Sequence, residues 1–177
     1  MANIVAFAGS NSSTSINYQL TRYTVSLVGE HKSRLLNMVD YNLPMFSEDL
    51  EREKGYSDVL IDLMEQIKLA DGLIISVNEH NSSPSAYFKN VIDWLSRLNK
   101  DFLLHKKVLL MSTSRGKRGG SSSLGIIKAI LPRFGADVVA TFSLPSFNHT
   151  FNEAKGVTDA ELSEEHKKAL ELFLSKI

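Results

Sequence analysis

The most constraining feature of this sequence is the stretch from Gly72 to Arg97, which combines a buried strand, a polar loop and an amphipathic helix. Residues 73–77 form a short apolar run rich in β-branched side chains, as in a strand covered on both faces of a parallel sheet. Residues 78–84 contain no large aliphatic side chain. The next segment has apolar residues at three- and four-residue spacing, which predicts a helix with one buried stripe. These residues are Phe88, Val91, Ile92 and Leu95. A polar loop thus follows the carboxyl end of a central strand, where open α/β sheets bind ligands.

The rest of the chain repeats the order of strand and helix. The predicted strands are Asn3–Ala8, Ser33–Val39, Leu73–Val77, Val108–Met111 and Val138–Leu144. The predicted helices are Ile16–Val28, Ser57–Leu69, Ala86–Arg97, Ser122–Phe134 and Thr158–Lys176, the last with a capping box from Thr158 to Glu161. Glu48–Gly55 is charged and is expected to be solvated. Five β-α repeats predict an α/β fold, a doubly wound five-stranded parallel sheet with helices on both faces, in one domain over residues 1–177. The pattern alone does not choose the order of the strands.

A loop of seven small residues, Gly9–Ser15, joins the first predicted strand to the first helix. The free N–H groups at a helix N-terminus favour a phosphate, and serine and threonine hydroxyls add donors. The alternative is that Ser15 or Thr14 only caps the helix.

A third polar loop follows the fourth strand, from Ser112 to Ser123, and contains three glycines and three cations. Glycine lets a backbone approach a flat ligand closely. The alternative is a flexible surface loop whose charges are solvated.

Several of these residues resemble the NADPH-dependent FMN reductase family. The segment Glu79-His80-Asn81-Ser82-Ser83, followed by Phe88-Lys89-Asn90-Val91-Ile92-Asp93-Trp94-Leu95-Ser96-Arg97, resembles its flavin-contacting segment E-[YH]-N-x-S and F/L-K-N-x-x-D-W-x-S-R. Gly9, Ser10, Ser15 and Asn17 match its phosphate loop, G-S-x-R-x-x-S-x-N, but Ser12 stands where many members have arginine. The third loop resembles S-x-G-x-x-G-G, with Arg115 where many relatives have proline or glycine.

This resemblance implies a flavodoxin-like fold with strand order 2-1-3-4-5, in which the three loops converge on one cleft. It implies FMN as cofactor, NADPH or NADH as co-substrate, and hydride transfer from the nicotinamide to flavin N5, then electron transfer to a small acceptor such as free flavin, a quinone or an azo compound. The alternative is an FMN-binding electron carrier or redox-sensing module with little turnover. Relatives are commonly oligomers, so a homodimer or homotetramer is expected.

The flavin-binding residues implied by the resemblance come from all three loops. They are Ser10, Ser12, Ser15, Ile16 and Asn17 in the first, Asn78, Glu79, His80, Asn81 and Ser82 in the second, and Thr113, Ser114, Arg115, Gly116, Arg118, Gly119 and Gly120 in the third. No catalytic side chain is nominated, because the flavin carries the chemistry. Arg115, Lys117 or Arg118 could stabilise the reduced flavin or attract the 2′-phosphate of NADPH. His80 could stack on the ring, donate to it, or be solvated.

Composition and missing motifs exclude other classes. Twenty basic and twenty acidic residues balance, which argues against a general nucleic-acid binder, and no cysteine is present. The chain lacks G-x-G-x-x-G, a Walker motif, a G-x-S-x-G elbow, the aspartates of a phospho-receiver and histidines at metal spacing. No apolar run is long enough to cross a membrane and no leader is recognised, so the expected location is the cytoplasm. Tyr87 and Trp94 lie outside the main helical stripe, and either an interface or ordinary core packing would explain them.

Overall fold

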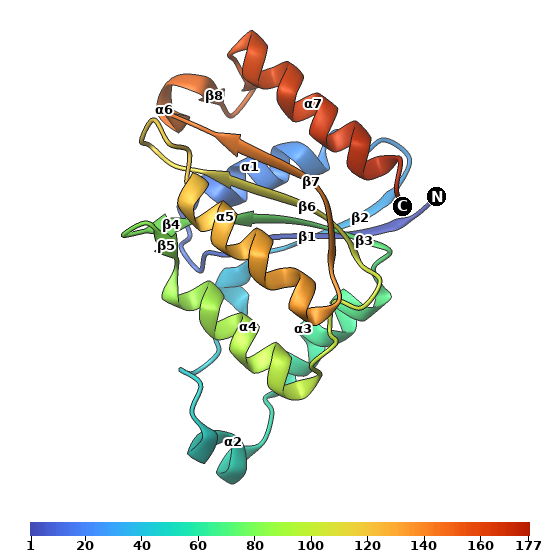
Figure 1. Ribbon diagram of the computed structural model, residues 1–177, viewed down its shortest axis with the longest axis vertical. Helices are drawn as coiled ribbons and strands as arrows, with labels where there is room; N and C mark the ends of the chain where they lie inside the picture. The colour runs from blue at the N-terminus through green and yellow to red at the C-terminus, as the bar shows by residue number, and fades with distance from the viewer.

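The computed structural model describes residues 1–177 as a twisted parallel sheet between two layers of helices (Figure 1). The main-sheet strands are β1 (Asn3–Ala8), β2 (Lys32–Leu36), β3 (Gly72–Val77), β6 (Lys107–Thr113) and β7 (Asp137–Leu144). The helices are α1 (Ile16–Val25), α2 (Glu48–Lys54), α3 (Asp58–Leu69), α4 (Ala86–Leu98), α5 (Ser121–Ile130), α6 (Phe147–Thr150) and α7 (Ala160–Leu174), with 3₁₀ turns at Met38–Asp40 and Leu131–Phe134. Two small hairpins pair β4 (Glu79–His80) with β5 (Ser83–Pro84) and β8 (Phe151–Asn152) with β9 (Gly156–Val157).

The order of the main sheet is β2-β1-β3-β6-β7, and all of its strands are parallel. Counting only main-sheet strands, this is the order 2-1-3-4-5 that the resemblance implied, and the predicted fold class is confirmed. Strands β1 and β3 are neighbours in register, with Phe7 opposite Ile75. The order reverses between these two strands, so the edge beyond their carboxyl ends is the switch point of the sheet.

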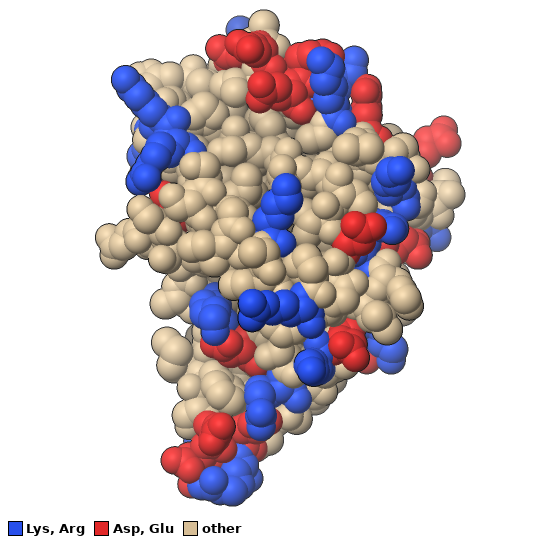
Figure 2. Space-filling view, viewed as in Figure 1, with Lys and Arg blue, Asp and Glu red and all other residues tan.

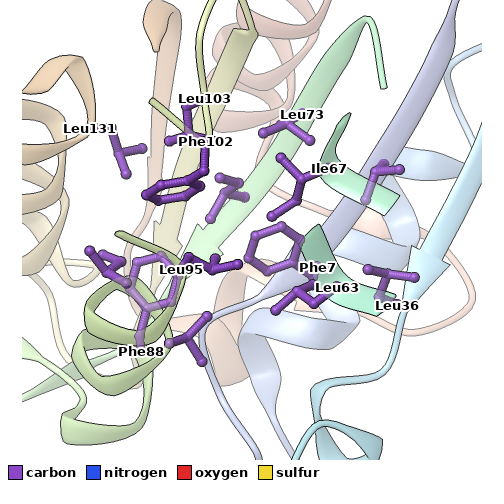
Figure 3. Packing of buried hydrophobic residues seen from close by; sticks show 14 of the residues in the cluster. Phe7, Leu36, Leu63, Ile67, Leu73, Phe88, Leu95, Phe102, Leu103 and Leu131 are labelled. Atoms are coloured by element: carbon purple, nitrogen blue, oxygen red, sulfur yellow. The ribbon is translucent and has the colours of Figure 1, made fainter. Parts of the chain in front are cut away.

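Alternating residues of each central strand point to opposite faces, and each face has its own apolar core. Val5, Leu73 and Val108 pack with α3, α4 and α5 in the larger cluster, which Figure 3 shows in close view. Ile4 and Ile74 pack with α1 and α7 on the other face. Because β3 is covered twice, all six of its residues are buried, which explains the continuous apolar run in the sequence.

Several predicted boundaries were wrong; the fourth strand, predicted as Val108–Met111, extends from Lys107 to Thr113. The second strand ends at Leu36 because the Asn37 side chain accepts a bond from the N–H of Val39 and starts a 3₁₀ turn. The fourth predicted helix changes to 3₁₀ at Leu131, since Pro132 has no N–H to continue the α-helical ladder. The first helix ends at Val25 rather than Val28. The last helix is capped by Asp159, whose carboxylate accepts from the N–H of Leu162, so the predicted capping box at Thr158 does not form.

The charged segment Glu48–Gly55 contains α2, which stands away from the sheet at the lower end of the molecule (Figure 1). Its connection to β2 is held by α4. Trp94 is 3% exposed and its indole N–H donates to the carbonyl of Pro44 at 2.7 Å. The Tyr87 hydroxyl contacts the carbonyls of Met38 and Tyr41 at 3.0 and 2.8 Å. Of the two explanations for Tyr87 and Trp94, the structure supports packing within the chain.

The 41–57 segment is therefore an arm that α4 anchors. Asn90 accepts from the N–H of Phe46 at 2.8 Å and donates to Pro44 at 2.9 Å. Arg97 pairs with Glu51 at 2.9 Å and lies over the Phe46 ring. No helix in the structure has both the length and the apolar character that crossing a membrane requires.

Candidate functional site

The three polar loops lie together at the carboxyl edge of the sheet. They follow β1, β3 and β6, which are consecutive neighbours in the strand order. In Figure 1 the strand arrowheads point to the left, and the β4–β5 hairpin and the loop before α5 extend beyond them. The first predicted site feature, convergence of the loops at one edge, is thus present in the backbone.

The first loop holds the N-terminus of α1. Ser15 is the helix cap, and its hydroxyl accepts from the N–H of Tyr18 at 3.2 Å. Ser10 and Ser12 fold the loop on itself by accepting from the N–H groups of Ser12 and Thr14. The N–H groups of Ile16 and Asn17 have no acceptor within the protein. Two first-turn donors and several exposed hydroxyls therefore remain for an anion.

Gly9 fixes the position of this loop against α4. A Cβ atom at this residue would lie 2.7 Å from the ring of Phe88, which is closer than side chains pack. The carbonyl of Gly9 also accepts from the hydroxyl of Ser85, the cap of α4, at 2.9 Å. The glycine of the phosphate-loop pattern thus has a packing reason in addition to its place in the loop.

Asn17 joins the first loop to the strands beneath the other two. Its side-chain oxygen accepts from the Ser76 hydroxyl at 2.8 Å and from the N–H of Thr113 at 3.0 Å. Its amide nitrogen donates to the carbonyl of Thr113 at 3.2 Å. Asn17 is only 2% exposed, so its side chain braces the site from below.

The second loop, which the sequence predicts only as a polar loop, is a tight hairpin. Asn81 and Ser82 both have left-handed backbones, with φ of 52° and 61°, between the paired residues His80 and Ser83. Two successive residues of this kind form the type I′ turn that suits a two-residue hairpin. The hairpin holds the predicted second-loop residues in a fixed shape.

Glu79 connects this hairpin to α5. Gly120 occupies the cap position of α5 and provides no side chain, so the helix lacks a local cap. The Glu79 carboxylate accepts from the N–H of Ser123 at 3.0 Å instead. The Ser123 hydroxyl donates back to the carbonyl of Asn78 at 2.9 Å. A carboxylate at a helix N-terminus is stabilised by the helix dipole and by the free N–H groups.

The third loop closes over the carboxyl end of β6 through its glycines. Gly119 has φ of 58°, and a Cβ there would collide with the Ser143 hydroxyl. Its carbonyl accepts from the Ser112 hydroxyl at 2.8 Å. The Thr113 hydroxyl donates to the carbonyl of Leu144 at 2.7 Å, and the Ser114 hydroxyl donates to that of Gly116 at 3.3 Å.

The three cations of this loop differ in their contacts. Arg118 donates to the Ser82 hydroxyl at 3.3 Å and lies 3.9 Å from the Glu79 carboxylate, so it spans the second and third loops. Arg115 and Lys117 are exposed and make no hydrogen bond or ion pair within the chain. Figure 2 shows Lys and Arg side chains gathered at the upper left, over the loop that precedes α5. Two unpaired cations therefore border this edge.

Asn78 tests whether these loops suit a ring that carries hydrogen-bonding groups. Asn78 Oδ1 is the one buried side-chain N or O atom in the chain without a hydrogen-bond partner. A buried polar atom of this kind is costly unless a ligand or water satisfies it. The flavin ring carries an N–H at its polar edge, so the donor and acceptor set of the loops fits this cofactor.

The neighbouring phenols are structural hydrogen-bonding groups. Burial raises the pKa of Tyr41 to about 12, with a further contribution from its hydrogen bond to Asp62. Burial also raises the pKa of Tyr87 well above its ordinary value. Both stay protonated near neutral pH and hold the segment after β2, so neither is poised to exchange a proton.

A surface groove of about 560 Å³ lies elsewhere, between α5, β7 and α7. None of the predicted site residues lines it. The residues that sequence reasoning missed are supports such as Ser76 and Ser123, because nothing in their local sequence indicates their distant partners. The resemblance counted Phe88–Arg97 as part of the flavin-contacting segment. In the structure, Asn90, Trp94 and Arg97 contact the arm instead.

The architecture and site define a flavodoxin-like α/β protein whose first loop has two N–H groups without an acceptor and whose other two loops lie beside it. Comparison with known proteins agrees with this class. The profile of the NADPH-dependent FMN reductase family matches residues 2–149. The chain belongs to that family.

Individual relatives are more distant. The chain is 38% identical over 90 residues to a quinone reductase of Escherichia coli (strain K12), covering 51% of this chain and 48% of that protein. It is 32% identical over 124 residues to an NADPH:quinone oxidoreductase of Arabidopsis thaliana, covering 69% and 63%. The match to the first of these thus spans about half the length of the relative.

Solved structures support the fold. FerB, a flavoenzyme NAD(P)H:(acceptor) oxidoreductase from Paracoccus denitrificans, superposes with a TM-score of 0.80 at 22% identity, covering 99% of this chain and 96% of FerB. The apo form of the NADH:FMN oxidoreductase EMOB gives a TM-score of 0.80 at 21% identity, covering 100% and 90%. At these identities the likeness establishes the common architecture.

Proposed function

We propose that this chain is an FMN-dependent NAD(P)H oxidoreductase that passes electrons to a small acceptor such as free flavin, a quinone or an azo compound, with residues 1–177 acting as one FMN-binding domain. The observation that carries the proposal is the convergence of three loops at the switch point, with two free N–H groups at the start of α1. Membership in the FMN reductase family supports the cofactor and the co-substrate.

The residues divide between ligand binding and support. The N–H groups of Ile16 and Asn17 and the hydroxyls of Ser10 and Ser12 would hold the phosphate, while Ser15 keeps the helix start in place. His80–Ser82 and the backbone of 113–120 would border the ring. Bound FMN would supply the redox chemistry by accepting hydride at N5 and passing electrons on, so the protein contributes position and electrostatics.

Arg115 and Lys117 are the better candidates for the 2′-phosphate of NADPH, because Arg118 already contacts Ser82 and Glu79. We expect Arg115→Ala to raise the KM for NADPH several-fold and to leave the KM for NADH unchanged, since only NADPH carries the extra phosphate. Equal changes for both nucleotides would contradict this assignment.

The function is tested by adding FMN to the purified apoprotein, following flavin fluorescence, and then adding NADPH without oxygen. The expected result is tight binding and rapid bleaching of the flavin absorbance. Binding without bleaching would favour an electron carrier or redox-sensing module. Failure to bind micromolar FMN would contradict the proposal and would point to the missing arginine at Ser12.

We further propose that the protein is a homodimer or homotetramer that works in the cytoplasm, where nicotinamide nucleotides are available. Ile61 and Leu104 are about half exposed and border a groove of about 530 Å³ beside α3, a surface that a second copy would cover. Sedimentation at micromolar concentration should give a dimer or tetramer mass, and a monomer at all concentrations would contradict this.

A further inference from the structure

The two edges of the main sheet differ in how they are protected from pairing with another chain. The edge strand β2 has five residues, and its Lys32 and Arg34 side chains are exposed. The opposite edge strand, β7, has eight residues and carries no charged side chain from Val138 to Leu144. A short strand and exposed charges are the features that keep an edge from pairing. Since β7 lacks both, it is the edge that remains able to pair.

The outer side of β7 opens into the groove of about 560 Å³, which is lined by six consecutive residues of the strand, 138–143. In Figure 1 the strand lies between α7 above it and α5 below it. β7 pairs only with β6, and apart from that ladder the backbone of 138–143 makes no hydrogen bond within the protein. An edge strand presents a row of N–H and C=O groups on its outer side. The groove therefore offers donors and acceptors to an added strand.

The α7 wall of this groove carries a stripe of side chains that is complementary to itself. Its members lie at three- and four-residue spacing and are Glu165, Lys168, Ala169 and Leu172. Glu165 and Lys168 are exposed; Glu165 makes no ion pair, and the nearest carboxylate to Lys168 is that of Glu164, at 3.6 Å. Leu172 is 46% exposed. An acid and a base one turn apart, beside an exposed apolar side chain, match a second such helix that runs in the opposite direction.

We propose that β7 is a contact surface for a second copy of this chain, whose own β7 pairs with it in the antiparallel direction. Two identical edges pair in this way about a two-fold axis perpendicular to the sheet, and two-fold symmetry is the commonest in homo-oligomers. The axis brings α7 of one copy beside α7 of the other. Glu165 of each copy then lies against Lys168 of the other, and the exposed Leu172 side chains are covered.

The α5 wall contributes less to this contact. Lys128 is the one residue of α5 that lines the groove. Its counterpart in the second copy has the same charge, so this wall adds no attraction, and the long side chain can turn its ammonium group to water. The preference for an antiparallel second copy therefore comes from the α7 stripe and the strand backbone.

This surface is separate from the groove beside α3. The two grooves share no lining residue. The inference thus deepens the proposed oligomer by naming a second contact surface. One two-fold contact gives a dimer, and two different two-fold contacts on the same chain give a tetramer.

The first experiment exchanges the charges on α7 and follows association by sedimentation. Lys168→Glu places like charges against each other, and we expect the dissociation constant of the oligomer to rise by about tenfold or more. The double variant Glu165→Lys, Lys168→Glu restores opposite charges and should associate as the wild type does. Lys167→Glu, at an exposed position outside the groove, is the matched control and should change nothing.

The second experiment blocks the strand. Thr141→Lys gives β7 the charge that protects β2, so it should prevent association through this edge. Ser33→Lys is the matched control, because it lies on the edge that already carries Lys32 and Arg34. Hydrogen exchange of the 139–143 amides measures the pairing directly. Their protection should rise with protein concentration in the wild type and stay constant in Thr141→Lys.

The outcomes separate this surface from the other proposals. A wild type that is monomeric at all concentrations would overturn it together with the proposed oligomer. An oligomer that is unchanged in Lys168→Glu and Thr141→Lys would overturn the β7 surface and leave the α3 surface standing. Failure of the double variant to associate would overturn the antiparallel arrangement. No predicted flavin-binding residue lines the groove, so FMN binding tests the proposed function separately. Thermal melting of each variant identifies any loss of fold.

Discussion

At the scale of single residues, the first loop depends on one missing side chain, at Gly9, and one missing charge, at Ser12. Gly9 leaves room for the Phe88 ring, and Ser12 uses its hydroxyl to accept from Thr14 rather than offering a cation. Each of these two residues can be substituted singly, so each gives a direct test of how the first loop works.

Ser12→Arg should tighten FMN binding about five- to tenfold. A guanidinium adds charge-assisted hydrogen bonds to the phosphate that hydroxyls and N–H groups otherwise hold alone. Fluorescence titration with FMN measures the change, and riboflavin, which lacks the phosphate, is the control ligand. A similar gain for riboflavin would show that the arginine acts on the ring or on the fold.

Gly9→Ala should lower the free energy of unfolding by about 1–3 kcal/mol, because its Cβ would press on the buried Phe88 ring. Gly125→Ala is the matched control. Gly125 lies within α5 with nothing within 4 Å of the added carbon, so alanine should stabilise the helix by about 0.5–1 kcal/mol. Urea unfolding measures both, and equal effects of the two changes would contradict the packing role of Gly9.

At the scale of elements, α4 performs two tasks from two surfaces. Its N-terminus holds the first loop through Ser85 and Phe88. Its later turns hold the arm through Asn90, Trp94 and Arg97. The helical part of the motif, Phe88–Arg97, is therefore explained largely by its contacts with the arm. The part that indicates flavin binding is the hairpin segment Glu79–Ser83.

Asn90→Ala should release the arm while the sheet stays folded. The N–H of Phe46 loses its side-chain partner and the carbonyl of Pro44 keeps only its bond from Trp94, which should cost about 1–3 kcal/mol locally. Hydrogen exchange of the 45–47 amides is expected to accelerate at least tenfold. Lys89→Ala, which removes an exposed pair with Asp93, should change nothing by more than about 0.5 kcal/mol. Unchanged exchange in Asn90→Ala would show that the arm is held without Asn90, through Tyr87, Trp94 and Arg97.

At the scale of the whole molecule, the last helix is joined to the sheet face through a buried histidine. His166 is 1% exposed and lies beside Tyr23 and Phe142. The Thr24 hydroxyl donates to the carbonyl of Leu20, so it accepts from His166 Nε2–H at 2.9 Å. Burial lowers the pKa of His166 to about 4, and folding therefore favours the neutral ring.

Global stability should consequently fall in acid. The unfolded chain binds a proton at His166 below about pH 6.5, while the folded chain resists it down to about pH 4. The contribution is fully present above pH 6.5 and is lost as the pH falls to 4, by on the order of 3 kcal/mol. Urea unfolding at several pH values measures it. In His166→Gln the difference from the wild type should shrink as the pH falls; a constant difference would contradict the assignment.

The class of fold, the alternation of elements and the three polar loops could be predicted from the amino-acid sequence. These follow from local causes: apolar runs favour buried strands, apolar spacing favours helices, and small polar residues favour turns. The family resemblance added the strand order, which the sheet confirms. The roles of the individual loop residues toward FMN remain predictions, and they are tested by the binding experiments above.

Which polar groups bond within the protein and which stay without a partner is seen only in the folded chain. Asn17, in the first turn of α1, and Glu79, in the second loop, both carry hydrogen-bonding side chains, yet Asn17 binds Ser76 and Thr113, and Glu79 caps α5. Asn78 is left with an unpartnered oxygen. These partners are 44 to 96 residues apart in the chain. Local sequence patterns carry no information on such distant pairs, because the pairs exist only after the parallel strands bring the loops to one edge.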